Sequence, residues 1–123
     1  MEQKSYHENL KSKIDEFVHL VYKLTKNFPR EELYGVTSQL RRAALSVALN
    51  YIEGYARNRR LVQINFFEMS YGSLKEAKYL LKFSIKEGFL AENNIDSSKA
   101  IELADEIGAM LWSALNGLRS KGK

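Results

Sequence analysis

The sequence predicts an all-α protein in which residues 1–123 form one antiparallel, up-down-up-down four-helix bundle. First, a chain of 123 residues is about one domain long. Second, 45% hydrophobic and 28% charged residues are typical of a folded globular protein rather than a disordered one. Third, one Pro and seven Gly are too few for the turns of a β-sandwich or barrel, whereas apolar residues recur at helical steps of three and four.

The first helix is expected over residues 5–27. Its apolar residues follow one another at steps of four and three, which places them on one stripe. Pro29 lacks a backbone donor and disfavours a helical conformation at Phe28, so the helix is expected to stop there, before a connector over residues 31–35. The stripe consists of Leu10, Ile14, Phe17, Val21, Leu24 and Phe28.

The second helix is expected over residues 37–55, with Thr37 or Ser38 as its cap and Gly54 loosening its end. Between Ala43 and Ile52 it is almost entirely apolar, whereas an exposed helix needs a wider polar face. We therefore expect other copies of the chain to cover what the three sibling helices leave exposed. The remaining polar groups form one narrow stripe of Gln39, Arg42, Ser46, Asn50, Glu53 and Arg57.

The third and fourth helices are expected over residues 59–87 and 97–119. Gly88 stands where a left-handed helix cap is common. Gly72 costs about 1 kcal/mol in helix propensity, which predicts a close helix crossing at that point. The fourth helix carries two neighbouring apolar lines, a width typical of a bundle helix. These lines are Ile101, Ala104, Gly108, Leu111, Leu115 and Leu118, and Leu103, Ile107, Met110 and Ala114.

Charge is unevenly distributed along a chain whose net charge is +4. Residues 37–62 contain five Arg and one Glu, whereas residues 92–117 contain one Lys and five acidic residues. The arginines fall into two groups on the second helix and its exit, roughly 24 Å apart along a helix axis. A single subunit is therefore expected to carry two separate basic patches and an acidic fourth helix.

The arginines are the candidate nucleic-acid contacts. Arginine pairs bidentately with phosphate oxygens, and the beginning of a helix also favours anions. The alternative is a solvated turn in which Arg57 pairs with Glu53 at i and i+4. The predicted contacts are Arg41, Arg42, Arg57, Arg59 and Arg60.

No catalytic, metal or cofactor site is predicted. Glu16 and His19 match the Glu-x-x-His element of bundle di-iron sites, but such a site needs a second Glu-x-x-His element on another helix. The only other histidine, His7, has Lys4 and not a glutamate three residues before it, so the second element is absent. The chain has no Cys and shows no strained turn for a Ser-His-Asp set. Without an apolar run of about 18 residues or a secretory leader at its start, we expect a cytoplasmic protein with no membrane partner.

A polar network is predicted at the interface between subunits. Asn50 and Glu53 lie on an otherwise apolar helix and need hydrogen-bond partners if they are buried. Arg41 or Arg42 of a neighbouring subunit would supply them and fix the register of the oligomer. The predicted interface consists of Ser46, Leu49, Asn50, Tyr51 and Glu53.

Several motifs resemble one bacterial family. They are Phe28-Pro29, the run from Gly35 to Ala44 (Gly-Val-Thr-Ser-Gln-Leu-Arg-Arg-Ala-Ala), Asn50-x-x-Glu53-Gly54, and Gly72-Ser73-Leu74 with Glu76. In order and spacing they resemble the four-helix bundle proteins encoded in intervening sequences of 23S rRNA genes. The resemblance implies an antiparallel bundle, assembly into a homopentameric ring and no enzymatic activity. The family is similar in fold to the basic accessory proteins of diversity-generating retroelements, which bind nucleic acid and a reverse transcriptase.

The chain departs from the family pattern around Asn50. Ala48 and Leu49 stand where a Pro-Ala pair usually precedes the Asn, and Tyr51 and Ile52 replace smaller or simpler apolar residues. Without the proline, a straighter second helix is expected. Bulkier side chains at Leu49 and Tyr51 are also expected to alter the contact between subunits of a ring.

Two functional hypotheses follow. The first is a non-enzymatic homo-oligomer, a pentamer by the family resemblance, that binds structured RNA or DNA through arginines brought together by symmetry. The second is an assembly or adaptor protein without direct nucleic-acid binding, whose acidic fourth helix meets a basic protein. Sensitivity of captured partners to nuclease distinguishes the two.

Overall fold

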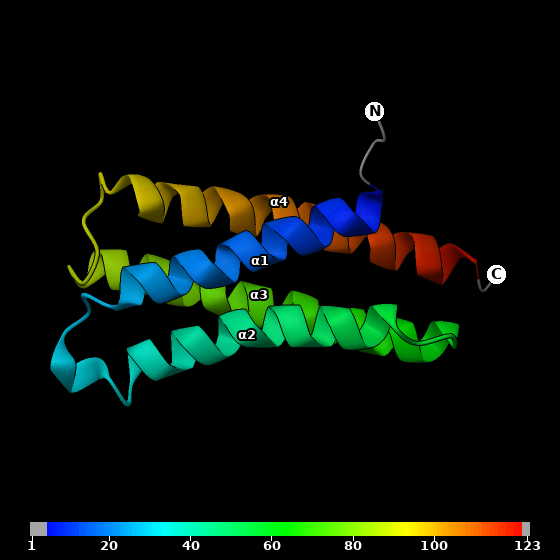
Figure 1. The fold of residues 1–123 in the computed structure, drawn as a ribbon, viewed down its shortest axis with the longest axis horizontal. Coiled ribbons are helices and arrows are strands. Elements are labelled where there is room, and N and C mark those ends of the chain that lie inside the picture. Colours follow the sequence, from blue (N-terminus) through cyan, green and yellow to red (C-terminus); the bar gives the residue numbers. More distant parts are fainter. Residues whose placement is uncertain (1–4, 122–123) are drawn as a thin grey trace.

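The computed structural model describes residues 5–121, which form four long helices and one short 3-10 turn. The elements are α1 (Tyr6–Thr25), η1 (Arg30–Glu32), α2 (Val36–Tyr55), α3 (Arg60–Lys86) and α4 (Ile95–Ser120). The described part of the chain contains no strand, so the predicted all-α, four-helix single domain is confirmed. Figure 1 shows the chain reversing direction at each connection, so that α1 begins and α4 ends at the same end of the bundle.

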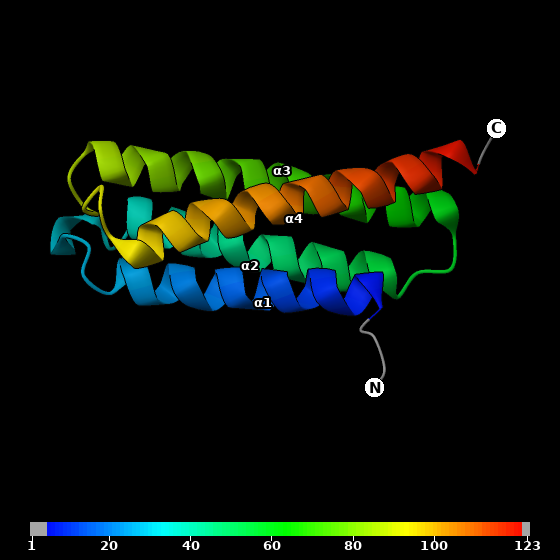
Figure 2. The ribbon, with the colours of Figure 1, turned by 90° about the horizontal axis from the view of Figure 1, so that it is seen from above.

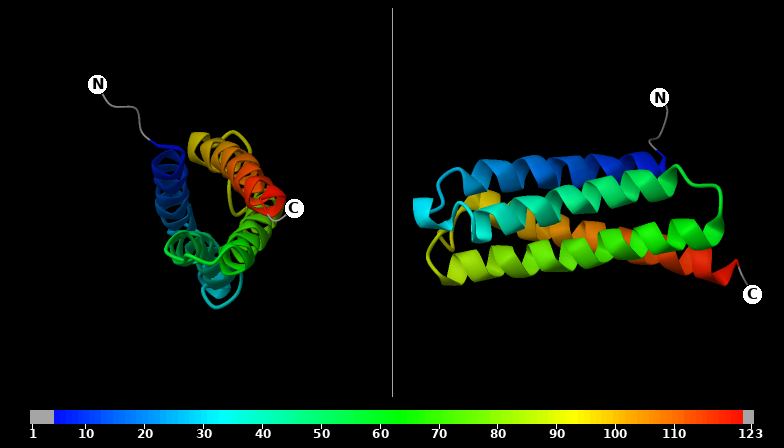
Figure 3. Two further views of the ribbon diagram at one scale, coloured as in Figure 1. Left: turned by 90° about the vertical axis from the view of Figure 1, so that its right-hand side faces the viewer. Right: turned by 90° about the horizontal axis from the view of Figure 1, so that it is seen from below.

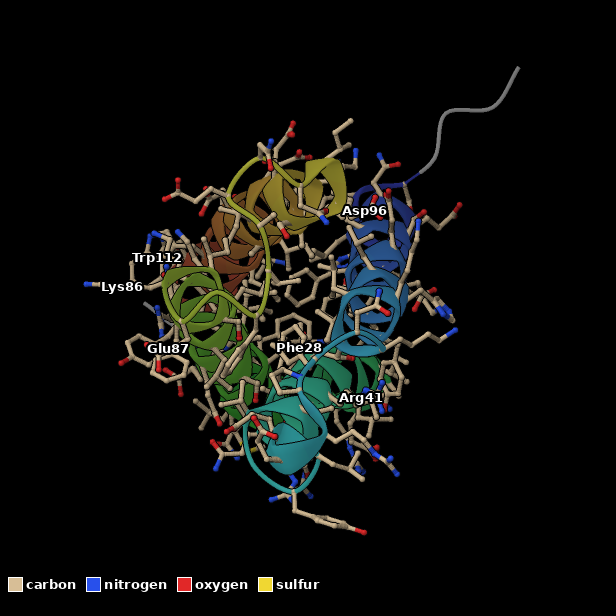
Figure 4. All side chains as sticks on the ribbon, turned by 90° about the vertical axis from the view of Figure 1, so that its left-hand side faces the viewer. Phe28, Arg41, Lys86, Glu87, Asp96 and Trp112 are labelled. Carbon is tan, nitrogen blue, oxygen red and sulfur yellow. The ribbon has the colours of Figure 1, made fainter. Side chains whose placement is uncertain are left out.

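The four helices lie lengthwise around one shared core (Figures 2 and 3). Each helix packs against the next along the chain, and α4 returns to pack against α1. All six residues of the predicted α1 stripe are buried in this core, because steps of three and four keep them on the inward side of the helix. Phe28 lies just beyond the end of α1 and closes one end of the core, as Figure 4 shows.

The helix ends are stabilised by local hydrogen bonds. Ser5 Oγ accepts a bond from the Glu8 N–H at 3.1 Å, and Asn94 Oδ1 accepts one from the Ser97 N–H at 3.0 Å. Beyond α3, Gly88 has φ +81°, and the Phe89 N–H donates to the Ser84 carbonyl at 2.8 Å. The predicted left-handed glycine cap is therefore confirmed.

The cap predicted at Thr37 or Ser38 is wrong. Helix α2 begins at Val36, so both residues lie inside its first turn. The Val36 N–H instead donates to Glu32 Oε1 at 3.2 Å, and Thr37 Oγ1 is buried without a hydrogen-bond partner. Glu32 of η1 thus supplies the hydrogen bond that was expected from Thr37 or Ser38. Its carboxylate reaches an N–H group at the beginning of α2 that has no acceptor within the helix.

The close helix approach predicted at Gly72 occurs at Gly54 instead. A Cβ atom on Gly54 would lie 2.8 Å from the Phe66 Cβ atom and equally close to the Phe67 ring. Gly54 is therefore packed against α3 and does not loosen the end of α2. Gly72 is exposed, and a Cβ atom there would meet nothing within 4 Å.

Candidate self-association and nucleic-acid surfaces

The outward face of α2 carries a row of exposed apolar side chains. Leu45, Leu49 and Ile52 are 38%, 62% and 46% exposed. Steps of four and three place them on one stripe, opposite the side that buries Leu40 and Val47. A single subunit therefore leaves this α2 apolar row, residues 45, 49 and 52, open to solvent, as the composition of the helix predicted.

A groove of about 790 Å³ runs beside the α2 apolar row. Leu33 and Tyr34 of the connector form part of its wall, and Tyr34 is the most exposed large apolar side chain described, at 93%. Apolar surface from two elements thus meets in one concave site, which is typical of interaction surfaces. The other lining residues are Tyr22, Thr37, Ser38, Arg41, Arg42, Leu45, Ser46, Leu49 and Asn50.

Arg41 and Arg42 stand at this groove in different states. Arg41 Nε donates to Thr25 Oγ1 at 2.8 Å, and its guanidinium carbon lies 4.8 Å from the centre of the Tyr22 ring. These contacts to α1 orient Arg41, which Figure 4 shows on the outer side of α1 and α2. Arg42 is exposed and forms no ion pair with any carboxylate of residues 5–121. Its charge is therefore available to an anionic partner.

The second arginine group lies at the turn between α2 and α3. Arg57 forms an ion pair with Glu53 Oε1 at 2.6 Å, as the alternative interpretation of this turn predicted. Arg60 Nη1 donates to the Leu118 carbonyl of α4 at 3.2 Å. Arg59, the exposed residue before α3, has no ion pair within the described chain. Within the described chain Arg59 and Arg60 both keep a charge that no carboxylate neutralises, and Arg59 is the more exposed of the two.

The structure keeps the two arginine groups apart within one subunit. Arg41 and Arg42 lie near the beginning of α2, and Arg57 lies just beyond its end. Figure 1 shows that these ends are at opposite ends of the bundle. One subunit therefore carries its two arginine groups as separate patches at opposite ends of the bundle.

The predicted polar network lies along the seam between α2 and α3. The Asn50 amide donates to the Ser46 carbonyl and to Ser46 Oγ, both at 2.9 Å, and Ser73 Oγ donates to Ser46 Oγ at 2.9 Å. Glu53 is exposed and pairs with Arg57 of its own chain. These polar groups thus find partners inside one subunit, and arginines from a neighbour are not needed to satisfy them.

Tyr51 belongs to the core and not to an interface, which corrects its predicted place. It is 2% exposed, and its ring stacks on Phe67 with centroids 5.1 Å apart. Its hydroxyl lies 2.6 Å from His7 Nδ1. Burial raises the pKa of the Tyr51 phenol well above its usual value and lowers the pKa of His7. The sequence spacing could have indicated that Tyr51 is buried, because it follows the buried residues Ala44 and Val47 at steps of three and four.

The acidic charge of α4 is largely paired within the subunit. Asp96 pairs with Lys23, Asp105 with Lys78, and Glu106 with Lys13. The hydrogen bond from Lys13 and its positive charge lower the pKa of Glu106. Three of the five carboxylates that define the acidic segment are thus neutralised by lysines of α1 and α3, which weakens the case for a basic protein partner at this face.

Residues 5–121 contain neither a cluster of metal ligands nor a helix suited to span a membrane. No group of three or more His, Asp or Glu side chains there is arranged to hold a metal ion, and His19 is exposed. Among the helices described, none combines the length and apolar character that a membrane span requires.

The comparisons identify the family. A family model described as 23S rRNA-intervening sequence protein matches residues 9–113. A crystal structure of a protein of unknown function from the S23 ribosomal protein family of Bacteroides thetaiotaomicron is similar in fold, with a TM-score of 0.78 and 21% identity. The similarity covers 86% of this chain and 97% of that one. No curated protein matches the sequence. Because the family model spans most of its length, the chain belongs to the 23S rRNA-intervening sequence protein family.

Proposed function

We propose that this protein is a non-enzymatic, self-assembling four-helix bundle that binds structured RNA or DNA through arginines brought together by assembly. The family resemblance makes the pentamer the expected oligomer. The observation that carries the proposal is the exposed α2 apolar row lying beside a groove that holds Arg41 and Arg42.

Self-assembly is supported by the cost of leaving the α2 apolar row in water. Removing apolar surface from water stabilises an assembly by about 25 cal/mol per Å². The exposed leucine and isoleucine side chains on one stripe of α2 provide a continuous apolar surface that a neighbouring subunit can bury. In a ring, each subunit offers one surface to its neighbour and receives a different one, so the groove of one copy accepts a face of the next. The proposal takes Leu45, Leu49 and Ile52 as the centre of this contact.

Nucleic-acid binding is supported by charge that the subunit itself leaves unpaired. Arg42 and Arg59 have no carboxylate partner in the described chain and lie at opposite ends of the bundle. A ring repeats both patches once per subunit, so several weak phosphate contacts act together. Contacts of this kind go to phosphate, carry little sequence preference and weaken with salt.

The adaptor hypothesis is less well supported. It depends on an acidic α4, and most of that acidic charge is already paired with lysines of α1 and α3. Partners captured from a native lysate that survive nuclease treatment would favour the adaptor role. Partners released by nuclease would favour nucleic-acid binding.

Sedimentation velocity at micromolar concentration tests the assembly. The wild type is expected at about five times the 14.2 kDa chain mass, and Leu49→Glu, which places a charge in the centre of the α2 apolar row, is expected at the mass of one chain. Ile95→Glu is the matched control, because Ile95 is 84% exposed and lies on α4. A wild type that remains monomeric contradicts the proposal.

Binding to a structured RNA, measured over a range of salt concentrations, tests the arginines. A steep loss of affinity with salt is expected. Changing Arg57, Arg59 and Arg60 together to Ala is expected to weaken binding strongly. The control changes Lys11, Lys23 and Lys99 to Ala, which removes the same charge from α1 and α4. Equal effects of the two triple variants would show that the arginine turn has no special role.

A further inference from the structure

An aromatic pair lies exposed between α3 and α4. Trp112 of α4 is 49% exposed, and its ring centroid lies 5.6 Å from that of Tyr71 of α3, with the two planes tilted by 44°. We call this pair the Trp112–Tyr71 shelf. Figure 4 shows Trp112 on the opposite side of the bundle from Arg41. The shelf is therefore remote from the groove and from the α2 apolar row, which are the surfaces that the proposed self-association assigns by residue.

A hollow of about 310 Å³ adjoins the shelf. Both rings line it, together with the small residues Ala104, Gly108 and Ala109 of α4. Small side chains beside large rings leave space in which a flat ligand can lie against an aromatic face. Asp105 lines the polar edge of the hollow, but its carboxylate is paired with Lys78.

One lysine and one arginine lie over the two rings. Lys75 Nζ lies 5.1 Å from the centre of the Tyr71 ring, and the Arg119 guanidinium lies 5.6 Å from that of Trp112 while pairing with Glu68. Lys75 forms no ion pair with a carboxylate of residues 5–121. This combination of exposed rings and adjacent cations favours a ligand that has both flat apolar groups and negative charge.

The structure assigns the Trp112–Tyr71 shelf as a binding site for unpaired bases of single-stranded nucleic acid. A base lies in the hollow against the two rings, and the flanking phosphates meet Lys75 and Arg119. A duplex hides the faces of its bases, so the shelf selects unpaired segments, whereas the arginines contact phosphates of either form. This inference rests on the proposed nucleic-acid function and adds to it a second surface with a different preference.

Intrinsic fluorescence gives a direct test, because Trp112 is the single Trp of the chain. Titration with a short oligothymidine is expected to change the tryptophan emission saturably. A duplex of the same length, even when bound, is expected to leave the emission nearly unchanged. Saturated binding of the oligothymidine without a change in emission would overturn the inference, as would an equal response to a polyglutamate peptide, since that would show a site that recognises charge alone.

Variants provide a second readout. Trp112→Ala is expected to weaken oligothymidine binding by about tenfold, whereas Trp112→Phe keeps most of the affinity because it preserves a stacking face. Tyr55→Ala is the matched control, because Tyr55 is 53% exposed and lies in a different aromatic cluster, against His7. Helix content by circular dichroism verifies that each variant is folded. Wild-type affinity in Trp112→Ala would contradict the inference.

The two proposals fail in different ways. If duplex RNA binds and the arginine triple variant loses it, but oligothymidine affinity does not depend on Trp112, the proposed function stands and the shelf assignment falls. If neither structured nor single-stranded nucleic acid binds, both fall.

Discussion

His7 of α1 and Tyr51 of α2 form a hydrogen bond at one end of the core, with 2.6 Å between His7 Nδ1 and the Tyr51 hydroxyl. Burial raises the pKa of Tyr51, so the phenol keeps its proton and can donate it to a neutral His7 whose Nδ1 carries no hydrogen. In this tautomer His7 Nδ1 accepts the bond, and protonation of the ring to an imidazolium removes that acceptor. Burial also lowers the pKa of His7, which agrees with a neutral ring in the folded protein.

This bond predicts a pH dependence of stability. The folded state lowers the pKa of His7 below the unfolded value of about 6.5, so the unfolded chain binds more protons as the pH falls. The stabilisation is therefore present above pH of about 6.5 and is lost as the pH falls through the folded pKa. Thermal melts at neutral and mildly acidic pH should show a smaller loss of Tm in His7→Phe than in the wild type.

His19→Phe is the matched control for this measurement, because His19 is exposed on the same helix. It should follow the wild-type pH dependence. The expected difference at His7 is of the order of one hydrogen bond, about 1 kcal/mol, or about 4 °C in Tm. Identical pH profiles for His7→Phe and the wild type would show that the bond contributes no net stability.

The two glycines at Gly54 and Gly72 predict opposite effects of the same substitution. In Gly54→Ala the new methyl group meets the Phe66 Cβ atom and the Phe67 ring at under 3.0 Å, and relieving this overpacking should cost about 1–3 kcal/mol. In Gly72→Ala it meets open space, and better helix propensity should stabilise the bundle by about 0.5–1 kcal/mol. Urea unfolding of both variants checks the pair, and a stabilised Gly54→Ala would contradict the close packing.

The contrast between these glycines shows which features the sequence alone could predict. Periodicity identified the helices and the inward stripe of α1, because the inward side of a helix follows from spacing within one segment. The register between two helices depends on how their surfaces interlock, so neither the approach at Gly54 nor the pairing of Tyr71 with Trp112 was predicted from sequence. The cap by Glu32 was missed for the same reason, since it depends on the fold of the connector.

The candidate site was predictable in part. The apolar excess on α2 was visible in the sequence, because too few polar residues were present to cover an exposed helix. The assignment of Tyr51 to the interface was wrong, because the phase of Tyr51 on the helix places its side chain inward, whereas the departure from the family pattern revealed only its bulk. The arginine patches were correctly expected to lie apart, since the spacing along one helix fixes their separation.

Substitutions at Leu49 and Leu111 should separate the stability of one subunit from the assembly of several subunits. Leu111 is fully buried between the helices, so Leu111→Ala should lower the free energy of unfolding by about 2–5 kcal/mol. Leu49 is 62% exposed, so Leu49→Ala should change the stability of the isolated subunit by less than about 0.5 kcal/mol. It should nevertheless raise the concentration needed for assembly, measured by sedimentation at several dilutions. A large loss of subunit stability in Leu49→Ala would mean that the side chain is covered within one chain.

The bond between Thr25 and Arg41 predicts a role for α1 in orienting a candidate phosphate contact. Thr25 Oγ1 donates to the Val21 carbonyl at 2.8 Å and accepts from Arg41 Nε at 2.8 Å, so Thr25→Val removes both interactions with little change in volume. The free energy of unfolding should fall by about 0.5–1.5 kcal/mol. RNA affinity should also fall, because Arg41 is no longer held in one orientation and must be ordered on binding. Ser97→Ala is the control, since Ser97 Oγ is also buried without a partner but lies on α4, away from the groove, so its removal should leave affinity unchanged. Equal RNA affinity in Thr25→Val and the wild type would exclude Arg41 from the contact surface or show that its orientation is irrelevant.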